Sequence, residues 1–183
     1  MSLKVICVTG MPGAGKSVFA GVAKKLGLKV INMGDVIREE AEREGVSDLG
    51  EVMLKLRRLH GEDVVARRCL SKLSPKDEVV VIEGVRSLAE VEVFKNAASE
   101  VIIVAIHASP SKRYEHLARR GRFDDPKSWE EFIERDLREL SVGLGSVIAL
   151  ADKMFLNEGS IENLEFQAKV FFQVFLHESK DKS

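Results

Sequence analysis

Residues 10–17 read GMPGAGKS and directly follow the apolar run LKVICVT at residues 3–9. Gly10, Gly15 and Lys16, with the adjoining serine, match the spacing GxxxxGK(S/T), typical of a loop between a buried strand and a helix. Glycines let such a loop curl until its N–H groups point at phosphate oxygens, and the helix start adds its positive dipole end. The pattern predicts a phosphate-binding loop, or P-loop, that holds a nucleoside triphosphate.

Within this loop, Lys16 is expected to reach the β- and γ-phosphates, and the hydroxyl of Ser17 is expected to bind Mg²⁺. A plain glycine- and proline-rich turn with a chance lysine is the competing explanation. The strand pattern before the loop and the helix pattern after it favour the P-loop. The loop residues expected to contact ATP are Gly10, Pro12, Gly13, Ala14, Gly15, Lys16, Ser17 and Val18.

Strand and helix patterns alternate along the rest of the chain. Residues 78–84 and 101–107 predict two more buried strands, and shorter strands are expected near 29–32 and 153–157. Such alternation implies right-handed crossovers and a parallel sheet covered by helices on both faces. Ligands then bind at the carboxyl ends of the strands. No linker divides the chain, so residues 1–183 are expected to form one domain.

A long amphipathic helix is expected over about residues 126–140. Arg135 and Arg138 fall on its polar face. The apolar residues that share its other face are Trp129, Phe132, Ile133, Leu137 and Leu140.

Composition narrows the function classes. The chain has 45% hydrophobic and 31% charged residues and a formal net charge of -1, so no overall basic field favours nucleic acid as a partner. Cys7 and Cys69 form no CxxC pair, which argues against a disulfide framework or a zinc site and is consistent with a reducing cytoplasm. No apolar run approaches a membrane span, so we expect a cytoplasmic protein without a membrane partner.

Charged residues follow two of the predicted strands. MGDVIREE carries Asp35 and Arg38 at a helix start, and VIEGVRS carries Glu83 and Arg86 beyond a buried strand. An acid at the end of such a strand can hold a Mg²⁺-bound water, and an arginine there faces the ligand cleft. Helix-capping acids and solvated arginines are the structural alternative.

A third charged segment, HLARRGRFDDP at residues 116–126, combines an arginine cluster with two aspartates. Phosphoryl transfer needs charge neutralisation, positioning and the exclusion of water more than covalent chemistry. A short arginine-rich lid that closes over the nucleotide would supply these, whereas an ordinary charged surface would not.

These motifs, in this order, resemble the P-loop small-molecule kinases of the adenylate kinase and nucleoside monophosphate kinase group, with archaeal adenylate-kinase-related proteins as the suspected nearest relatives. In that group a GD..R segment and an arginine after the third strand bind the phosphate of the acceptor. The resemblance implies acceptor contacts from Asp35, Arg38, Gly84 and Arg86.

The lid of that group carries a GR.DD segment and a later arginine, which GRFDD and Arg135 resemble here. The spacing is slightly longer than usual, so Arg138 could take the role of Arg135. The implied roles are catalysis by Lys16, Asp35, Arg122 and Arg135, ATP contact by Arg120, and metal binding by Ser17 and Glu83.

The segment ADKMFLNEGSIENL resembles dephospho-CoA kinases, in which the corresponding loop cradles the adenine of ATP. This second resemblance implies ATP contacts from Asn157 and Gly159.

Together the resemblances imply a three-layer α/β/α sandwich with a five-stranded parallel sheet in the order 2-3-1-4-5. A helical acceptor-binding insert is expected at about residues 34–75, and a short lid at about 113–140. The segment 46–70 resembles neither family closely, so the base of the acceptor stays open.

Three functions are compatible with the sequence. The favoured one is transfer of the γ-phosphate of ATP to a nucleoside monophosphate such as AMP, with Mg²⁺ as cofactor. A hydroxyl acceptor, as in dephospho-CoA kinases, would instead require Asp35 as a general base. The third is a nucleotide-switched binding or assembly module with slow ATPase activity. The sequence leaves the oligomeric state open.

Overall fold

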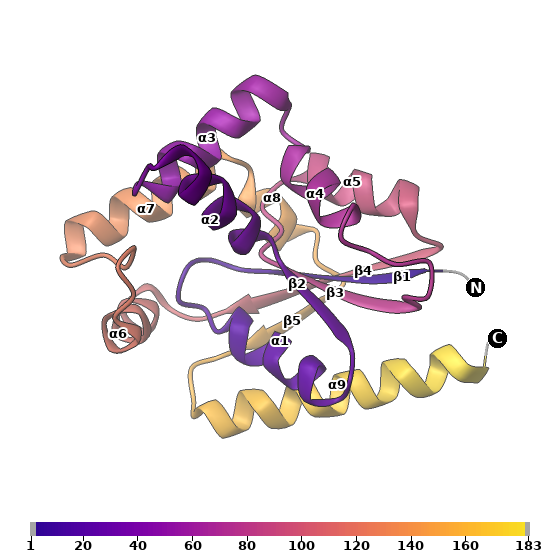
Figure 1. The fold of residues 1–183 in the computed structure, drawn as a ribbon. Helices are drawn as coiled ribbons and strands as arrows, with labels where there is room; N and C mark the ends of the chain where they lie inside the picture. Colours follow the sequence, from indigo (N-terminus) through magenta and orange to yellow (C-terminus); the bar gives the residue numbers. More distant parts are fainter. Residues whose placement is uncertain (1–2, 182–183) are drawn as a thin grey trace.

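The computed structural model describes residues 3–181, with side chains described as far as residue 178. Its centre is a five-stranded parallel sheet in the order β2-β3-β1-β4-β5, as the sequence predicts (Figure 1). The strands are β1 (Lys4–Thr9), β2 (Lys29–Asn32), β3 (Val79–Glu83), β4 (Glu100–His107) and β5 (Lys153–Leu156).

The helices lie between and after these strands. They are α1 (Lys16–Lys25), α2 (Met33–Glu44), α3 (Leu49–His60), α4 (Val64–Leu70), α5 (Leu88–Ala97), α6 (Pro110–Arg120), α7 (Trp129–Ser141), α8 (Leu144–Ala149) and α9 (Ile161–Asp181). Helices α2, α3 and α4 occupy the region predicted for the acceptor-binding insert. Helix α6 and most of α7 occupy the region predicted for the lid. Helix α8 was not expected from the sequence.

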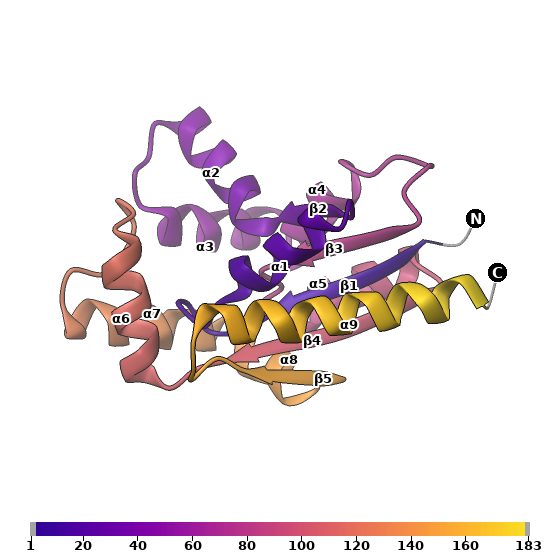
Figure 2. The same cartoon turned by 90° about the horizontal axis from the view of Figure 1, so that it is seen from below.

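Side-chain alternation along β1 explains the three layers. Val5 and Cys7 point to one face of the sheet, whereas Ile6 and Val8 point to the other, and all four are fully buried. Strand β1 pairs with both β3 and β4, so its two faces need apolar cover. Helices α1 and α9 cover one face, and α2 to α5 with α8 cover the other (Figures 1 and 2). The predicted α/β sandwich is confirmed.

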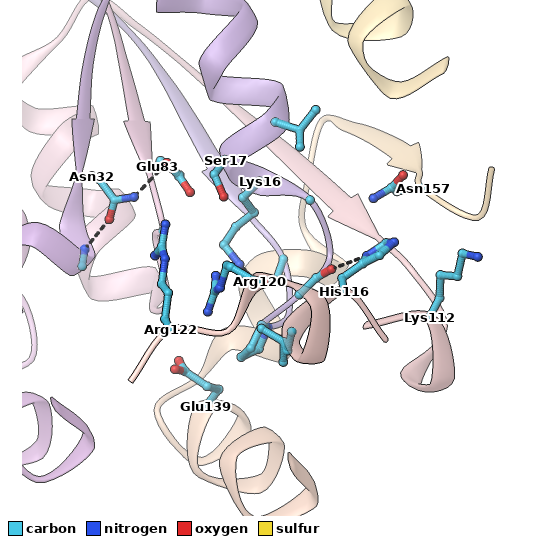
Figure 3. Close-up of a pocket in the computed structure, with 18 of the residues that line it drawn as sticks. Lys16, Ser17, Asn32, Glu83, Lys112, His116, Arg120, Arg122, Glu139 and Asn157 are labelled. Carbon is cyan, nitrogen blue, oxygen red and sulfur yellow. Dashed lines mark hydrogen bonds between the residues drawn. The ribbon is translucent and has the colours of Figure 1, made fainter. Parts of the chain in front are cut away.

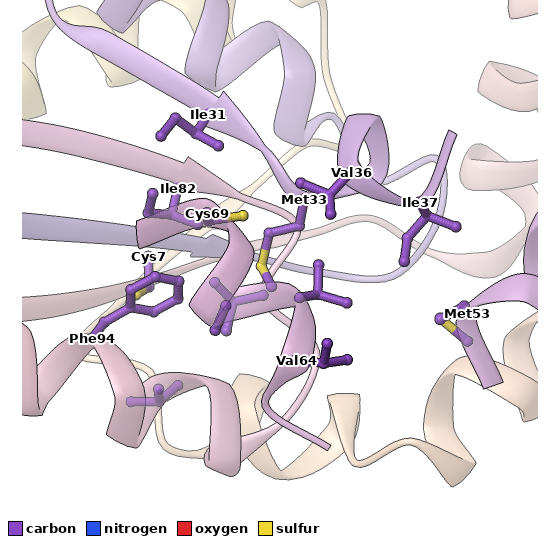
Figure 4. Close-up of a cluster of buried hydrophobic side chains, with 14 of the residues drawn as sticks. Cys7, Ile31, Met33, Val36, Ile37, Met53, Val64, Cys69, Ile82 and Phe94 are labelled. Carbon is purple, nitrogen blue, oxygen red and sulfur yellow. The ribbon is translucent and has the colours of Figure 1, made fainter. Parts of the chain in front are cut away.

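Both cysteines belong to the core beneath α2 to α5. Cys7 on β1 and Cys69 on α4 are free thiols and completely buried beside Phe94 and Ile82 (Figure 4). Burial, reinforced by Glu90, raises the pKa of the Cys69 thiol to about 12. Neither thiol is therefore a reactive nucleophile, and both serve as small apolar side chains.

Helix α7 departs from the expected pattern. Of the apolar residues on its predicted inner face, only Phe132 is buried, while Trp129 is 42% and Leu137 61% exposed. The buried side instead carries Asp136 and Glu139. These carboxylates bind arginines that come from other elements, so ion pairing rather than apolar burial sets the rotation of this helix.

The carboxyl ends of the strands meet at one edge of the sheet, where α6 and α7 also lie (Figure 1). The loops after β1, β2 and β3 therefore converge there. Within residues 3–181, no helix combines the length and apolar content that a membrane crossing requires.

Candidate functional site

The loop between β1 and α1 has the backbone that the sequence predicts for a P-loop. Gly10 and Gly13 adopt φ values of 143° and 80°, which residues other than glycine rarely adopt. A Cβ at Gly10 would lie 2.2 Å from the carbonyl oxygen of Ile106, and one at Gly13 would lie 2.5 Å from that of Arg113. Helix α1 begins at Lys16 without a side-chain cap, so its first N–H groups remain available to an anion.

Lys16 lies over the loop that precedes it. Its Nζ donates to the carbonyl oxygens of Gly10 at 2.6 Å and Met11 at 3.1 Å. Burial, with a smaller contribution from the Arg86 charge, lowers the pKa of Lys16 to about 8. The ammonium group is thus poorly solvated, and among the described residues its hydrogen-bond partners are two neutral carbonyls, so an anion placed against it would be strongly favoured.

A cavity of about 590 Å³ opens above the P-loop (Figure 3). Nearly all of the predicted site residues line it. These are Gly10, Pro12, Gly13, Gly15, Lys16, Ser17, Val18, Arg38, Glu83, Gly84, Arg86, Arg120, Arg122, Arg135, Asn157 and Gly159. We call it the P-loop cavity.

Two predicted residues do not line this cavity. Ala14 is buried below the loop, where its carbonyl oxygen accepts a hydrogen bond from the Asn157 side chain at 3.0 Å. The side chain of Asp35 is 60% exposed and forms an ion pair with Arg38 at 2.5 Å. It therefore holds an arginine beside the cavity rather than facing the cavity itself.

Glu83 and Ser17 provide oxygen atoms close to the P-loop lysine. Glu83 ends β3, is 8% exposed and accepts a hydrogen bond from Asn32 Nδ2 at 2.8 Å. Burial raises its pKa, while Lys16 and Asn32 partly oppose the shift. Both residues line the P-loop cavity (Figure 3). A carboxylate and a hydroxyl beside a phosphate site suit Mg²⁺, which usually binds through one or two carboxylates, water and substrate phosphates.

Arg113 connects the lid region to the P-loop. It is 4% exposed, and its guanidinium donates to the carbonyl oxygen of Pro12 at 3.1 Å and to Asp136 at 2.8 and 2.5 Å. It also stacks over the ring of Phe132, 4.8 Å from the centroid. Arg113 is not among the site residues predicted from the sequence, because nothing in the sequence of α6 separates it from the exposed arginines of that helix.

The two aspartates of GRFDD form hydrogen bonds with Arg120, Arg122 and Arg135. Asp125 accepts from Arg120 Nε at 3.0 Å and from the backbone N–H of Arg122 at 2.9 Å. Arg135 donates to the backbone carbonyl oxygen of Asp124 at 2.8 Å. The aspartates thus shape the loop that carries the arginines toward the P-loop cavity.

A second cavity, of about 500 Å³, lies between α3 and α7. We call it the distal cavity. The residues that line both cavities are Gly34, Arg38, Arg86, Asp124, Arg135 and Glu139. The two cavities therefore adjoin each other, and the shared arginines lie between them.

Arg86 is held at this junction by Glu139, which the sequence analysis also missed. Arg86 Nε donates to Glu139 at 2.7 Å, and Nη1 donates to the Gly84 carbonyl oxygen at 2.9 Å. Burial acts to raise the pKa of Glu139, but Arg86 and Lys16 hold it below its ordinary value. Glu139 is therefore a buried carboxylate among cations. An anionic ligand would compete with it for these cations.

Comparison with known proteins identifies a family and a fold for this chain. Residues 9–133 match the AAA domain family. UPF0200 proteins from Staphylothermus marinus and Hyperthermus butylicus are 52% and 51% identical to the chain. The first match covers 88% of this chain and 87% of the relative, and the second covers 90% and 91%.

Solved structures of small-molecule kinases share the fold. A shikimate kinase from Acinetobacter baumannii, solved in complex with shikimate, has a TM-score of 0.61 at 16% identity, covering 96% of this chain and 94% of the other. A gluconokinase from Sinorhizobium meliloti also has a TM-score of 0.61, at 17% identity, covering 98% and 97%. At such identities the likeness establishes the architecture and not the substrate.

The P-loop prediction is thus confirmed, whereas the narrower resemblances to adenylate kinases and dephospho-CoA kinases stay predictions. The chain has a P-loop nucleotide-binding domain with the architecture of small-molecule kinases, and it belongs to the UPF0200 family of archaeal proteins.

Proposed function

We propose that the protein transfers the γ-phosphate of ATP to the phosphate of a nucleoside monophosphate. One observation carries the proposal: the distal cavity adjoins the P-loop cavity, and Arg38 and Arg86 line both. Two arginines at the junction of a donor site and an acceptor site suit an acceptor that is itself a phosphate.

The charges on the donor side fit phosphoryl transfer. Lys16, Arg120, Arg122 and Arg135 line the P-loop cavity, where they would neutralise the charge that spreads over the transferred phosphoryl group. Mg²⁺ held near Ser17 and Glu83 would neutralise charge on the β- and γ-phosphates. The protein contributes position and electrostatics, and an ionised acceptor phosphate needs no general base.

A hydroxyl acceptor is less well supported. It must lose its proton, and the base expected for that step, Asp35, is exposed and lines neither cavity. Glu83 would have to serve instead, although its position also suits Mg²⁺. The exposed position of Asp35 therefore favours the phosphate acceptor over the hydroxyl acceptor.

The test is the rate of ADP formation from MgATP with a panel of acceptors, namely AMP, IMP, GMP, CMP, UMP and dephospho-CoA. We expect a monophosphate to raise the rate and to be converted to its diphosphate, and Lys16→Ala to abolish the reaction. Stimulation by dephospho-CoA alone would favour the hydroxyl kinase. A slow rate that no acceptor changes would favour the nucleotide switch.

The acceptor role of Arg86 needs a matched pair of variants, because Arg86→Met alone would leave Glu139 buried without its partner. The double variant Arg86→Met/Glu139→Gln removes both charges. We expect it to raise the KM for the acceptor by roughly 10- to 150-fold, the value of a charge-assisted hydrogen bond, with the KM for ATP little changed. An unchanged acceptor KM would place the acceptor phosphate elsewhere.

A further inference from the structure

The far end of the distal cavity is the part of the site that the transfer chemistry leaves unexplained. It lies between the start of α3 and the end of α7, away from the P-loop. Arg138 lines this end and does not line the P-loop cavity, whereas Arg135 lines both. Arg135 is therefore the α7 arginine on the ATP side, and Arg138 has a different role.

Arg138 differs from the other arginines around the cavity in having no acid partner. Arg38 pairs with Asp35, and Arg86 pairs with Glu139. Arg138 makes no ion pair or side-chain hydrogen bond in the part of the chain that the structure describes, and its Nε is buried without a partner. An unpaired buried donor carries a desolvation cost, so this guanidinium indicates a missing hydrogen-bond acceptor.

Gly50 sets the position of that guanidinium. A Cβ at Gly50 would lie 2.5 Å from Cζ, 2.6 Å from Nη1 and 2.8 Å from Nε of Arg138. Because the three distances are so similar, the flat face of the group rests on the first turn of α3. Asp48 caps that turn by accepting from the N–H of Gly50 at 2.8 Å. The donor edge of Arg138 is thereby held in a defined orientation.

Part of the remaining lining is apolar and suits the stacking of a planar ring. Phe123 in the lid is 70% exposed, and it lines the distal cavity together with Ile37, Leu49 and Met53. An exposed aromatic ring beside an aliphatic wall is a favourable place for a base to stack. The cavity volume of about 500 Å³ is in the usual range for small-molecule sites.

We propose that Arg138, positioned by Gly50, selects acceptors whose base presents a keto oxygen rather than an amino group at this end of the cavity. The inference rests on the proposed function. A guanidinium has only donors, so it can donate to a keto oxygen, and in a purine also to the neighbouring N7, whereas an amino group at the same position offers it only hydrogens. The acceptor class is then a nucleoside monophosphate with a hypoxanthine, guanine or uracil base rather than adenine or cytosine.

Two pairs of acceptors that differ only at the group in question test the inference. IMP and AMP differ at position 6 of the purine, and UMP and CMP differ at position 4 of the pyrimidine. In at least one pair, we expect the keto member to have a kcat/KM about 10- to 100-fold higher. Near-equal values in both pairs, or a preference for the amino member, would overturn the inference.

Arg138→Met is the decisive variant, because methionine keeps an unbranched stem over Gly50 and removes the donors. We expect it to lower kcat/KM for the keto member and leave the amino member nearly unchanged, so that discrimination disappears. Gly50→Ala, which displaces the guanidinium, should have the same effect. Arg43→Met is the matched control, since Arg43 is 74% exposed at the end of α2. An equal loss for all acceptors with Arg138→Met would show a merely structural role.

Calorimetric binding of IMP and AMP without ATP separates the two proposals. A keto preference in binding that Arg138→Met removes, without phosphoryl transfer to any acceptor, would overturn the proposed function and support the base selection. Transfer to monophosphates without a keto preference in rate or binding would support the proposed function and overturn the base selection. The melting temperature of each variant shows whether a loss reflects unfolding.

Discussion

The cations around the P-loop are already partnered by oxygen atoms of the chain itself. Lys16 donates to two loop carbonyl oxygens, Arg86 to Glu139, and Arg135 to the Asp124 carbonyl oxygen. A phosphate that enters the site therefore exchanges one set of oxygen partners for another. Folding has therefore already removed part of the water around these cations. Because the groups are fixed before the ligand arrives, they can stabilise its charge with little further rearrangement.

The lowered pKa of Lys16 predicts how ATP affinity depends on pH. Because the pKa of the unliganded group is about 8, the ammonium is largely charged at pH 7 and largely neutral at pH 9. ATP requires the charged form, so above pH 8 binding must be coupled to the uptake of a proton. We expect the Kd for MgATP to rise by up to about tenfold per pH unit between pH 8 and 9.5.

The measurement is calorimetric titration with MgATP across this pH range. Lys16→Arg serves as the control, because its guanidinium remains charged throughout and its profile should be flat. A wild-type profile as flat as that of the arginine variant would show that Lys16 does not titrate in this range.

At the scale of elements, buried ion pairs join α3 to α5 and α7 to the β3–α5 loop. Arg57 of α3 and Glu90 of α5 form an ion pair with side chains only 7% and 0% exposed. Glu90 also accepts from the backbone N–H of Arg86 at 2.7 Å and completes the capping box of α5 with Ser87. One carboxylate thus connects α3 to the loop that carries Arg86.

This connection predicts that removing one member of the Arg57–Glu90 pair destabilises the protein more than removing both charges. Arg57→Met should lower the free energy of unfolding by about 3 to 5 kcal/mol, because it leaves the Glu90 charge buried and uncompensated. The double variant Arg57→Met/Glu90→Gln should lose less, since no isolated charge remains. Arg67→Met, which removes a mostly exposed i,i+4 pair with Asp63, should change stability by less than about 1 kcal/mol.

Urea unfolding of the three variants checks these values. If the double variant were as unstable as Arg57→Met or more so, the pair would contribute net stability of its own, and the argument from buried charge would fail.

At the scale of the whole molecule, the site unites parts of the chain on both faces of the sheet. The P-loop leads into α1 on one face, whereas Arg38 and the distal cavity belong to the helices on the other. Arg113 and Asp136 join α6 and α7 to Pro12 of the P-loop. A nucleotide bound at this junction should therefore stabilise the folded chain as a unit.

MgATP should accordingly raise the melting temperature. At a concentration of about 100 times Kd, linkage supplies about 2.7 kcal/mol, which for a chain of this length corresponds to roughly 5 to 10 °C. Differential scanning fluorimetry with and without MgATP measures the shift, and Lys16→Ala should lose most of it. A full shift in Lys16→Ala would mean that the nucleotide binds elsewhere.

Local patterns were sufficient for the sheet and for the phosphate-binding loop. The apolar run before Gly10, the glycine spacing and Lys16 specify a strand, a loop and a helix start through contacts within a few residues. The strand order follows from the same alternation together with the family resemblance. These features depend on backbone geometry and side-chain periodicity, and the residue types within a short stretch of sequence indicate both.

The orientation of charged side chains depended on the tertiary structure. Asp35 follows β2 as the motif requires, yet it is exposed and paired with Arg38. Arg113 and Arg138 appear in the sequence as surface arginines, but one is buried against the P-loop and the other lies over Gly50. The partners of such groups lie far apart in the sequence; the ion pair between Arg86 and Glu139, for example, spans 53 positions. Short-range periodicity carries no information about such pairs, because their energy arises only when folding removes both charges from water.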